Sequence, residues 1–305
     1  MEISLVIPLY DEEAVVPGLV NRTILALKKI TDDFELILVD DGSTDNTLEL
    51  IMGLRDKDKR IKILQLSRNF GHQAAYTAGM EKAKGAFVGL MDGDLQDPPE
   101  LFAEMYALLS EDKADVVYGK RTGKINPGGR SVLSHWFHKG FKTISGLEGI
   151  EHVGNFSMMN RAALSAMLSF SEKTRYLPGI RRFIGFRQKF VEYEREERNI
   201  GRSKMKLGQL ISLSSDAIFS FSKVPIRICL YLGVIGVIIF FLAGIYTIIA
   251  KIAGFAVLGW SSTLLSIYFL GSIQLTFLGV LGEYIYRIHK ESQNRPLFLV
   301  KDYFS

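Results

Sequence analysis

The stretch VGLMDGDLQDPPE, residues 88–100, places several acidic side chains directly after an apolar run that is typical of a buried strand. Asp92 and Asp94 supply carboxylate oxygens, and Gln96 supplies an amide oxygen nearby in the chain. Such hard oxygen ligands suit Mg²⁺ or Mn²⁺, which proteins often bind through carboxylates shared with substrate phosphates. A capped turn between a strand and a helix would need only one acid. The spacing therefore predicts a site for Mg²⁺ or Mn²⁺ formed by Asp92, Asp94 and Gln96.

A second acidic cluster, DDGSTD at residues 40–45, follows another apolar run. Ser43 or Thr44 is predicted to cap the helix that comes next, and one polar side chain is enough for that role. The preceding acid pair, Asp40 and Asp41, could also bind a nucleobase or a ribose, as acids at strand ends do in dinucleotide-binding folds. Neither a G-x-G-x-x-G nor a G-x-x-x-x-G-K-[ST] motif is present, so neither a dinucleotide cofactor nor a P-loop is indicated.

These clusters need a scaffold that brings the ends of several strands together. Short apolar runs without polar alternation are separated by segments of helical periodicity, which indicates parallel strands buried on both faces. The runs cover residues 3–9, 35–40, 61–66, 86–91 and 115–118. Sheets of this kind bind ligands beyond the carboxyl ends of their strands. We therefore expect a doubly wound α/β domain whose polar strand ends meet at one edge.

The composition changes sharply in the C-terminal third of the chain. Residues 228–250 are 23 consecutive positions without a charge, and as a helix they would reach about 35 Å. The hydrocarbon core of a bilayer is about 30 Å thick, so one such helix can span it. A second uncharged run covers residues 252–282, and its Gly-rich beginning suits a turn, which places the second span at 262–282. A buried core helix is the alternative for one apolar run, but two in succession predict a membrane hairpin.

Basic residues predict the orientation of this hairpin. They flank it at both ends, whereas the loop between the spans offers only Lys251; the flanking residues are Lys223, Arg227, Arg287, His289, Lys290 and Arg295. The positive-inside rule then places both termini in the cytoplasm. The N-terminal MEISLVIPLY lacks the features of a signal peptide and reads as a first strand.

Further composition limits the class of protein. Cys229 is the single cysteine, so there is neither a disulfide framework nor a cysteine-based metal site. The net charge of +4 is only mildly basic and gives no case for binding nucleic acid. Residues 203–225 are amphipathic, which fits helices at the membrane interface, although packing against the soluble domain is an open alternative.

Several long motifs together resemble those of family 2 glycosyltransferases with the GT-A fold. They are VIPLYDEE, VDDGSTD, LSRNFGHQAAYTAGM, MDGDLQDPPE and GRSKMK. Within that family the chain is most similar to the polyprenyl-phosphate glycosyltransferases, the relatives of dolichol-phosphate mannose synthase and bactoprenol glucosyltransferase. The C-terminal GVLGEYIYRIHKESQNRPLFLV resembles the tail of the bacterial members that have two helices. The resemblance therefore covers nearly the whole chain.

The resemblance implies an organisation in four parts. Residues 1–202 would form a cytoplasmic GT-A domain with a Rossmann-like mixed α/β sheet, and residues 203–225 would form juxtamembrane amphipathic helices. The transmembrane hairpin would occupy 226–288, followed by a cytoplasmic tail at 289–305. Members of the family also suggest a homotetramer.

The resemblance also assigns roles to individual residues. A nucleotide pocket would be lined by Pro8, Tyr10, Glu12 and Asp41. Tyr10 would lie beside the base, and Arg121 would face the phosphates. The divalent metal that bridges the diphosphate would be bound by Asp92, Asp94 and Gln96. A basic pair in RNIGRSK that grips phosphate next to the membrane would be Arg198 and Lys204. A pair of solvated interfacial charges is the alternative for these last two residues.

One position departs from the family pattern. Relatives commonly carry an acid in a G-D-F segment on the acceptor side, whereas this chain has Val153-Gly154-Asn155-Phe156. An amide cannot take up a proton, so the role of a base at Asn155 is in doubt. The chain is then either a variant or an enzyme that needs no protein base.

The sequence thus predicts an inverting glycosyltransferase of the bacterial inner membrane. It would move a sugar, with UDP-glucose as the favoured donor, to undecaprenyl phosphate at the cytoplasmic face. A processive polysaccharide synthase is disfavoured because neither Trp136 nor Trp260 lies in a Q-x-x-R-W motif. A catalytically silent membrane scaffold or a nucleotide-sugar sensor is the alternative from another class.

Overall fold

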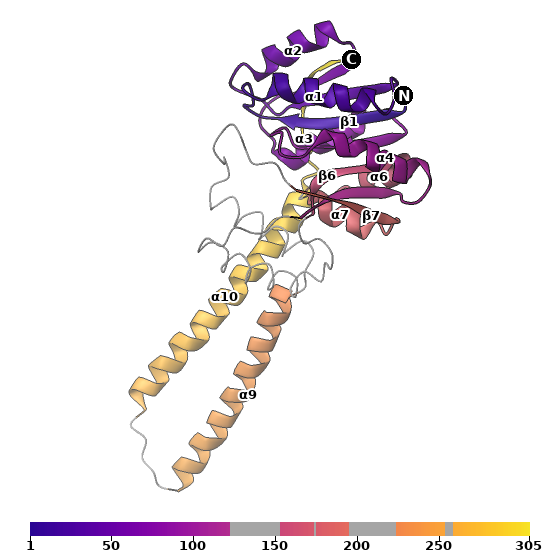
Figure 1. The fold of residues 1–305 in the computed structure, drawn as a ribbon. Coiled ribbons are helices and arrows are strands. Elements are labelled where there is room, and N and C mark those ends of the chain that lie inside the picture. The colour runs from indigo at the N-terminus through magenta and orange to yellow at the C-terminus, as the bar shows by residue number, and fades with distance from the viewer. Residues whose placement is uncertain (123–152, 174, 195–223, 254–258) are drawn as a thin grey trace. The chain divides into compact units, whose positions relative to one another are not determined.

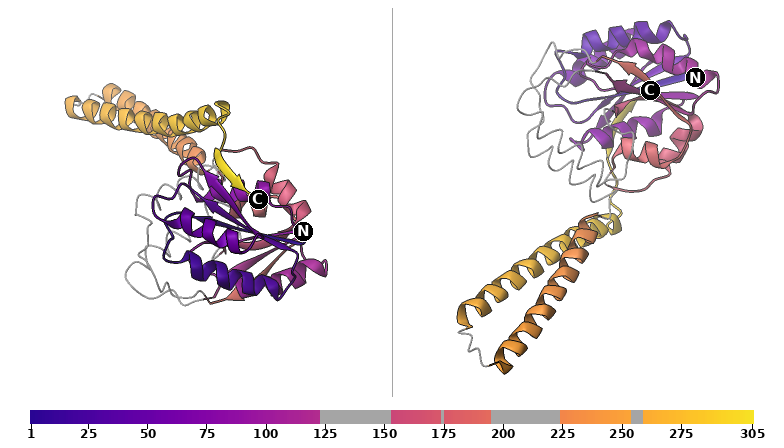
Figure 2. Two further views of the ribbon diagram at one scale, coloured as in Figure 1. Left: turned by 90° about the horizontal axis from the view of Figure 1, so that it is seen from above. Right: turned by 60° about the horizontal axis from the view of Figure 1, so that its bottom comes forward.

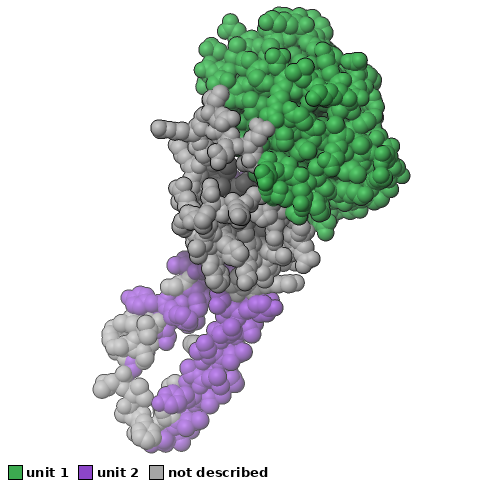
Figure 3. Space-filling model, viewed as in Figure 1, with its two compact units in different colours: residues 1–139, 147–205, 295–305 green, residues 140–146, 206–294 purple. Residues whose placement is uncertain are grey.

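The computed structural model describes residues 1–122, 153–173, 175–194, 224–253 and 259–305. Two compact units make up the chain (Figure 3). The first contains residues 1–139, 147–205 and 295–305, and the second contains residues 140–146 and 206–294. Arg198, Lys204 and most of the amphipathic segment predicted at 203–225 lie outside the described residues, so their predicted roles remain predictions.

The first unit is built on an eight-stranded sheet in the order β7-β5-β6-β4-β1-β2-β3-β8 (Figure 1). Its strands are β1 (Ile3–Leu9), β2 (Phe34–Asp40), β3 (Ile61–Leu66), β4 (Phe87–Leu90), β5 (Val116–Arg121), β6 (Val153–Asn160), β7 (Gln188–Tyr193) and β8 (Val300–Phe304). The central strands β4, β1, β2 and β3 are parallel, as the apolar runs predicted. β6 runs antiparallel to its neighbours β4 and β5, and β8 runs antiparallel to β3, whereas β5 and β7 pair in parallel. The sheet is therefore mixed, and the predicted α/β fold class is confirmed.

Helices cover both faces of this sheet (Figure 2), which is why its central strands are apolar at successive positions. On one face α1 (Val16–Lys28), α2 (Thr47–Lys57), the 3₁₀ turn η1 (Pro99–Leu101) and α4 (Phe102–Ser110) enclose a core with Leu5 and Ile7 of β1. On the other face α3 (His72–Lys82), α6 (Arg161–Leu168) and α7 (Leu177–Phe183) enclose a core with Val6. Because Val6 lies between Leu5 and Ile7 in the strand, alternate side chains of β1 serve opposite cores.

The parallel strands place their carboxyl ends along one edge of the sheet. The loops that follow these ends contain residues 10–15, 41–46, 67–71 and 91–98. These are the polar clusters that the sequence predicted to converge. The register supports this arrangement, since Leu9 at the end of β1 lies opposite Asp40 at the end of β2.

The C-terminus of the chain is a strand of the same sheet, which the sequence analysis did not foresee. β8 pairs antiparallel with β3, and Tyr303 lies opposite Leu64. Arg55 on α2 donates hydrogen bonds to the carbonyl oxygen of Phe304 at 3.3 Å and to that of Ser305 at 2.7 Å. The segment predicted as a tail is thus fixed to the edge of the first unit.

The second unit contains two long apolar helices. α9 covers Val224–Ile252 and α10 covers Trp260–Ser292, so both are longer than the spans predicted at 228–250 and 262–282. By length and composition, windows at Cys229–Tyr246 and Ser266–Ser292 are suitable for crossing a membrane. Two such helices suggest an association with membranes.

Candidate functional site

The loops after β1 and β2 are joined by hydrogen bonds at the edge of the sheet. The backbone N–H of Asp11 donates to Ser43 Oγ at 3.1 Å, and the N–H of Thr44 donates to Asp11 Oδ1 at 2.7 Å. The N–H of Glu12 donates to Thr47 Oγ1 at 2.8 Å. Asp11 adopts a φ of 52°, which turns the chain sharply after β1. The two loops therefore form one rigid wall.

The predicted helix cap at Ser43 or Thr44 is wrong. Helix α2 begins at Thr47, and the carboxylate of Asp45 accepts the hydrogen bond from the N–H of Thr47 at 3.0 Å. Ser43 and Thr44 instead contact Asp11, because the neighbouring strand end offers long-range partners that the local sequence does not reveal.

Three residues predicted to line a nucleotide pocket lie at the end of β1 and in the loop that follows it. Pro8 is buried within β1 opposite Val39, whereas Tyr10, which follows the strand, is 37% exposed. Glu12 is partly buried beside it in the chain. An exposed aromatic ring at a strand end offers a face on which a nucleobase can stack.

Asp41 connects this wall to the next loop. Its carboxylate accepts hydrogen bonds from the N–H groups of Phe70 at 2.8 Å and Gly71 at 2.9 Å, and its side chain is buried. Burial raises the pKa of Asp41, while the two N–H donors act in the opposite direction. Gly42 follows with a φ of +70° and lies against the backbone of Arg68. Asp41 thus positions the loop that leads into α3.

The loop after β4 presents the predicted metal ligands. Asp92, Asp94 and Gln96 are all partly buried, and Asp94 Oδ1 accepts a hydrogen bond from the N–H of Gln96 at 3.2 Å. Gly93 lies so close to β1 that a Cβ there would be 2.9 Å from the carbonyl oxygen of Pro8. The glycine therefore permits a close approach of this loop to the backbone of β1.

The chemistry of these donors fits a hard divalent cation. Carboxylate and amide oxygens are the ligands that Mg²⁺ and Mn²⁺ prefer. Within the described ranges, no group of three or more His, Cys, Asp or Glu side chains is arranged to hold a metal ion. A cation here would consequently need the amide oxygen of Gln96 and oxygens of a substrate in addition to Asp92 and Asp94.

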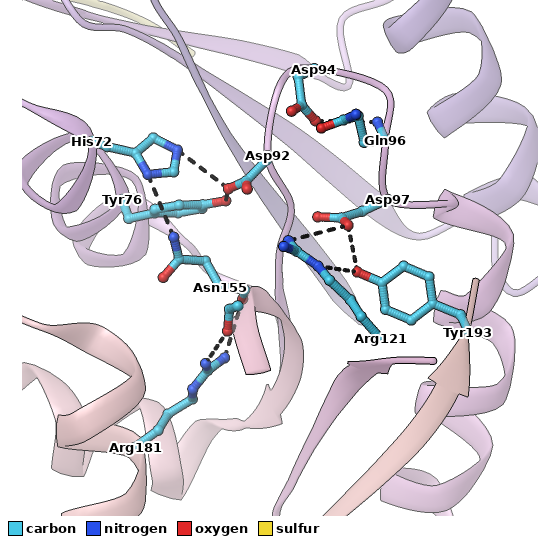
Figure 4. A network of polar contacts seen from close by, with 11 residues as sticks. His72, Tyr76, Asp92, Asp94, Gln96, Asp97, Arg121, Asn155, Arg181 and Tyr193 are labelled. Atoms are coloured by element: carbon cyan, nitrogen blue, oxygen red, sulfur yellow. Dashed lines mark hydrogen bonds and ion pairs between the residues drawn. The ribbon is translucent and has the colours of Figure 1, made fainter. Parts of the chain in front are cut away.

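Two residues of α3 bind Asp92 (Figure 4). The hydroxyl of Tyr76 donates to Asp92 Oδ1 at 2.7 Å, and His72 Nε2 lies 3.3 Å from the same oxygen. The two rings pack edge to face with their centroids 4.8 Å apart. Burial, and then the charge of Asp92, raise the pKa of Tyr76 far above its ordinary value, so the phenol keeps its proton as a donor.

A second network surrounds Arg121 at the end of β5. Arg121 Nε donates to the hydroxyl of Tyr193 at 3.2 Å, and its terminal nitrogen lies 3.7 Å from the buried carboxylate of Asp97. Tyr193 also donates to Asp97, and burial followed by the charge of Asp97 raises the pKa of Tyr193. A Cβ at Gly154 would be 3.0 Å from the guanidinium of Arg121. These contacts fix the guanidinium between the loop after β4 and the start of β6.

Asn155 lies on β6 next to the Asp92 network. Its Nδ2 is 3.5 Å from His72 Nδ1, and the strand segment that carries it is supported by Arg181 (Figure 4). Arg181 is almost fully buried and donates to the carbonyl oxygens of Asn155 at 3.1 Å and Gly154 at 2.5 Å. Burial lowers the pKa of Arg181 to about 10. The residue at the predicted acceptor side is thus brought into contact with the predicted metal side.

The structure adds residues that the sequence analysis did not single out, namely His72, Tyr76, Asp97, Arg181 and Tyr193. His72 and Tyr76 are four residues apart, the spacing that places two side chains on one face of a helix. That signal lies inside the motif LSRNFGHQAAYTAGM. Asp97 lies inside the motif MDGDLQDPPE, but its partners Arg121 and Tyr193 come from segments distant in sequence, where no local pattern predicts the pairing.

Comparisons with known proteins agree with this architecture. Residues 4–171 match the family described as Glycosyl transferase family 2. The chain is 36% identical over 305 residues to the bactoprenol glucosyl transferase of Shigella phage SfV, and the alignment covers 99% of each protein. It is 35% identical to the uncharacterized glycosyltransferase YkcC of Bacillus subtilis, with 99% of this chain and 94% of that protein covered.

A solved structure has a similar fold at low sequence identity. It is glucosyl-3-phosphoglycerate synthase from Mycobacterium tuberculosis in complex with Mn²⁺, UDP and phosphoglyceric acid. The TM-score is 0.51 at 20% identity, and the match covers 71% of this chain and 76% of that one. At this identity the likeness concerns the fold alone.

Proposed function

Because the chain belongs to glycosyltransferase family 2, we propose that it transfers a sugar from a nucleotide donor to a polyprenyl phosphate. The favoured pair is UDP-glucose and undecaprenyl phosphate, with inversion at the sugar. The observation that carries this proposal is the match to a bactoprenol glucosyl transferase over 99% of both chains. That match includes both apolar helices as well as the catalytic sheet.

The edge of the sheet suits a donor that leaves as a nucleoside diphosphate. Pro8, Tyr10 and Glu12 would bind the nucleoside, and Asp41 would support them by fixing the neighbouring loop. A divalent cation bound by Asp92, Asp94 and Gln96 would neutralise the negative charge that develops on the diphosphate. The guanidinium of Arg121 lies at the same edge and would add to this electrostatic stabilisation.

The amide at Asn155 is compatible with a phosphate acceptor. A hydroxyl acceptor must lose a proton on attack and needs a general base. A phosphate monoester has a second pKa of about 6, so most molecules already carry the attacking oxyanion at neutral pH. The protein then has to orient the acceptor and limit its repulsion from the donor. We assign Asn155 to orientation, together with the basic pair Arg198 and Lys204.

The C-terminal strand supports an arrangement with both termini on one side of a membrane. β3 precedes the two helices in the chain and β8 follows them, yet the two strands pair in one sheet. Helices that cross a bilayer between paired strands must cross it an even number of times. Together with the flanking basic residues, this supports a hairpin in the bacterial inner membrane with the sheet in the cytoplasm, where nucleotide sugars are available.

Sugar transfer by the purified full chain tests the proposal. The assay measures glucose transfer from UDP-glucose to undecaprenyl phosphate in detergent with Mn²⁺, and Asp94→Asn should abolish it because a hard cation needs the anionic oxygen. Asp56→Asn is the matched control, since Asp56 begins a second D-x-D sequence but is exposed and pairs with Lys59. Metal-stimulated transfer by Asp94→Asn would contradict the metal assignment. Binding of UDP-glucose without any transfer would favour the scaffold or sensor.

A further inference from the structure

A series of polar contacts leads from Asn155 through His72 to Asp92. We propose that His72 and Tyr76 are positioning residues that fix Asp92 for the cation, and that Asn155 selects the tautomer of His72 required for this. The inference rests on the proposed function, because it concerns the predicted metal ligand. It gives the amide at position 155 a task of its own.

Tyr76 supplies the rigid part of this arrangement. Its side chain is fully buried in the core formed by α3, α6 and α7, so the ring cannot move without disturbing that core. The hydroxyl reaches Asp92 Oδ1 at 2.7 Å, within the ordinary range for an O–H donor and a carboxylate. The position of this oxygen is therefore set by the packing of a helix.

His72 contributes a second contact to the same oxygen, and its chemistry defines a tautomer. His72 Nε2 lies 3.3 Å from Asp92 Oδ1, and because a carboxylate can only accept, the tautomer with its hydrogen on Nε2 suits this contact. In a neutral imidazole the other nitrogen, Nδ1, is then an acceptor. Asn155 Nδ2 lies 3.5 Å from Nδ1, so in this tautomer the amide of Asn155 can donate to His72.

The identity of residue 155 matters for this assignment. An aspartate side chain at that position would offer only acceptor oxygens to Nδ1, and the tautomer that donates to Asp92 would lose its partner. Arg181 fixes the backbone of Asn155 through its carbonyl oxygen, which keeps the amide beside His72. An amide at this position therefore suits the arrangement better than an acid.

Both contacts are made to Oδ1 of Asp92, and Oδ2 would be the oxygen that binds the cation. Side chains that hydrogen-bond a ligating carboxylate commonly orient it, and their loss weakens metal affinity by about 10–100-fold. We expect Tyr76→Phe and His72→Ala each to weaken Mn²⁺ binding by a factor in that range. His72→Gln should recover part of the loss, because its amide can still donate to Asp92.

The experiment measures Mn²⁺ affinity of the full chain in detergent, with UDP present, from the electron paramagnetic resonance signal of free Mn²⁺. Tyr106→Phe is the matched control, because this phenol also donates to a carboxylate, that of Glu2, in a part of the domain that the site does not include. Thermal melting of each variant tests whether the fold is retained.

The outcomes separate the inference from the proposed function. If the wild-type chain does not bind Mn²⁺ with UDP, the proposed metal-dependent function is wrong and the inference fails with it. If the wild-type chain binds and the Tyr76→Phe and His72→Ala variants, folded like the wild type, bind within twofold of it, only the inference is overturned. A loss in His72→Ala that His72→Gln partly restores, with Tyr106→Phe unchanged, supports it.

Discussion

Replacement of Gly42 by alanine tests the joint between the loops after β2 and β3. Gly42 has a φ of +70°, and an alanine Cβ there would lie 2.6 Å from the carbonyl carbon of Arg68 and 2.7 Å from the nitrogen of Asn69. Both are backbone atoms, so the chain itself must shift. A left-handed conformation costs about 1–2 kcal/mol for a residue with a Cβ. Overpacking adds about 1–3 kcal/mol, so Gly42→Ala should cost roughly 2–5 kcal/mol.

Gly185 is the matched control for this substitution. It has the same φ of +70°, but no atom of the described residues lies within 4 Å of the position of its Cβ. Gly185→Ala should therefore cost only the conformational part, about 1–2 kcal/mol. For a domain of this size, 1 kcal/mol lowers the melting temperature by about 2–4 °C. Gly42→Ala should then melt roughly 4–20 °C below the wild type, and Gly185→Ala roughly 2–8 °C below it.

Scanning calorimetry of the detergent-solubilised chain measures these shifts, and UDP binding follows the effect on the site. Gly42→Ala should also weaken UDP binding, because Asp41 connects the same two loops. Equal melting temperatures for Gly42→Ala and Gly185→Ala would refute the close approach of the two loops.

Three further changes have distinct expected results. Asn155→Asp should change the transfer rate by less than about tenfold, and the wild-type rate should rise with pH through about 6 and then level off; a gain of about 10²–10⁴-fold would reveal a missing general base. Burial raises the pKa of Asp40, so its contribution to stability is present near pH 4 and is lost as the pH rises through the raised pKa. In Asp40→Asn the melting temperature should therefore fall less between pH 4 and 7 than in the wild type, and the free energy of unfolding at pH 7 should rise by about 1–3 kcal/mol. The same dependence of melting temperature on pH in both proteins would contradict this. Removal of residues 298–305 should lower the melting temperature and promote aggregation, because the edge of β3 becomes exposed, and a soluble variant with wild-type melting would show that β8 is dispensable.

The central sheet was predictable because its signal is local. Strands that are buried on both faces read as continuous apolar runs, and the runs at 3–9 and 61–66 match β1 and β3 residue for residue. β6 was missed because VGNFSMMN mixes polar and small residues with apolar ones. β8 was missed because VKDYF carries two charges and gains its place only by pairing with β3.

The candidate site was predictable to a smaller extent. Acids at strand ends are visible in the sequence, so Asp41, Asp92 and Asp94 could be identified as candidates. Their partners could not, because the contact of Tyr76 with Asp92 depends on how α3 packs on the sheet. The failed cap at Ser43 has the same cause, since its hydroxyl accepts a hydrogen bond from the N–H of Asp11 in the loop after the neighbouring strand. Local patterns predict which residues carry chemistry, whereas tertiary packing decides what they contact.

The position of β8 has a consequence for how the protein is made. Synthesis proceeds from the N-terminus, so β1 to β7 leave the ribosome before α9 and α10, and the last strand is produced after both helices. If only one helix were inserted, the final residues would be delivered to the opposite side of the membrane and β3 would keep an open edge. If α9 and α10 form the proposed membrane hairpin, completion of the sheet therefore requires that both helices have been inserted. Chains that fail this step would expose a strand edge, which quality-control proteases and chaperones can recognise.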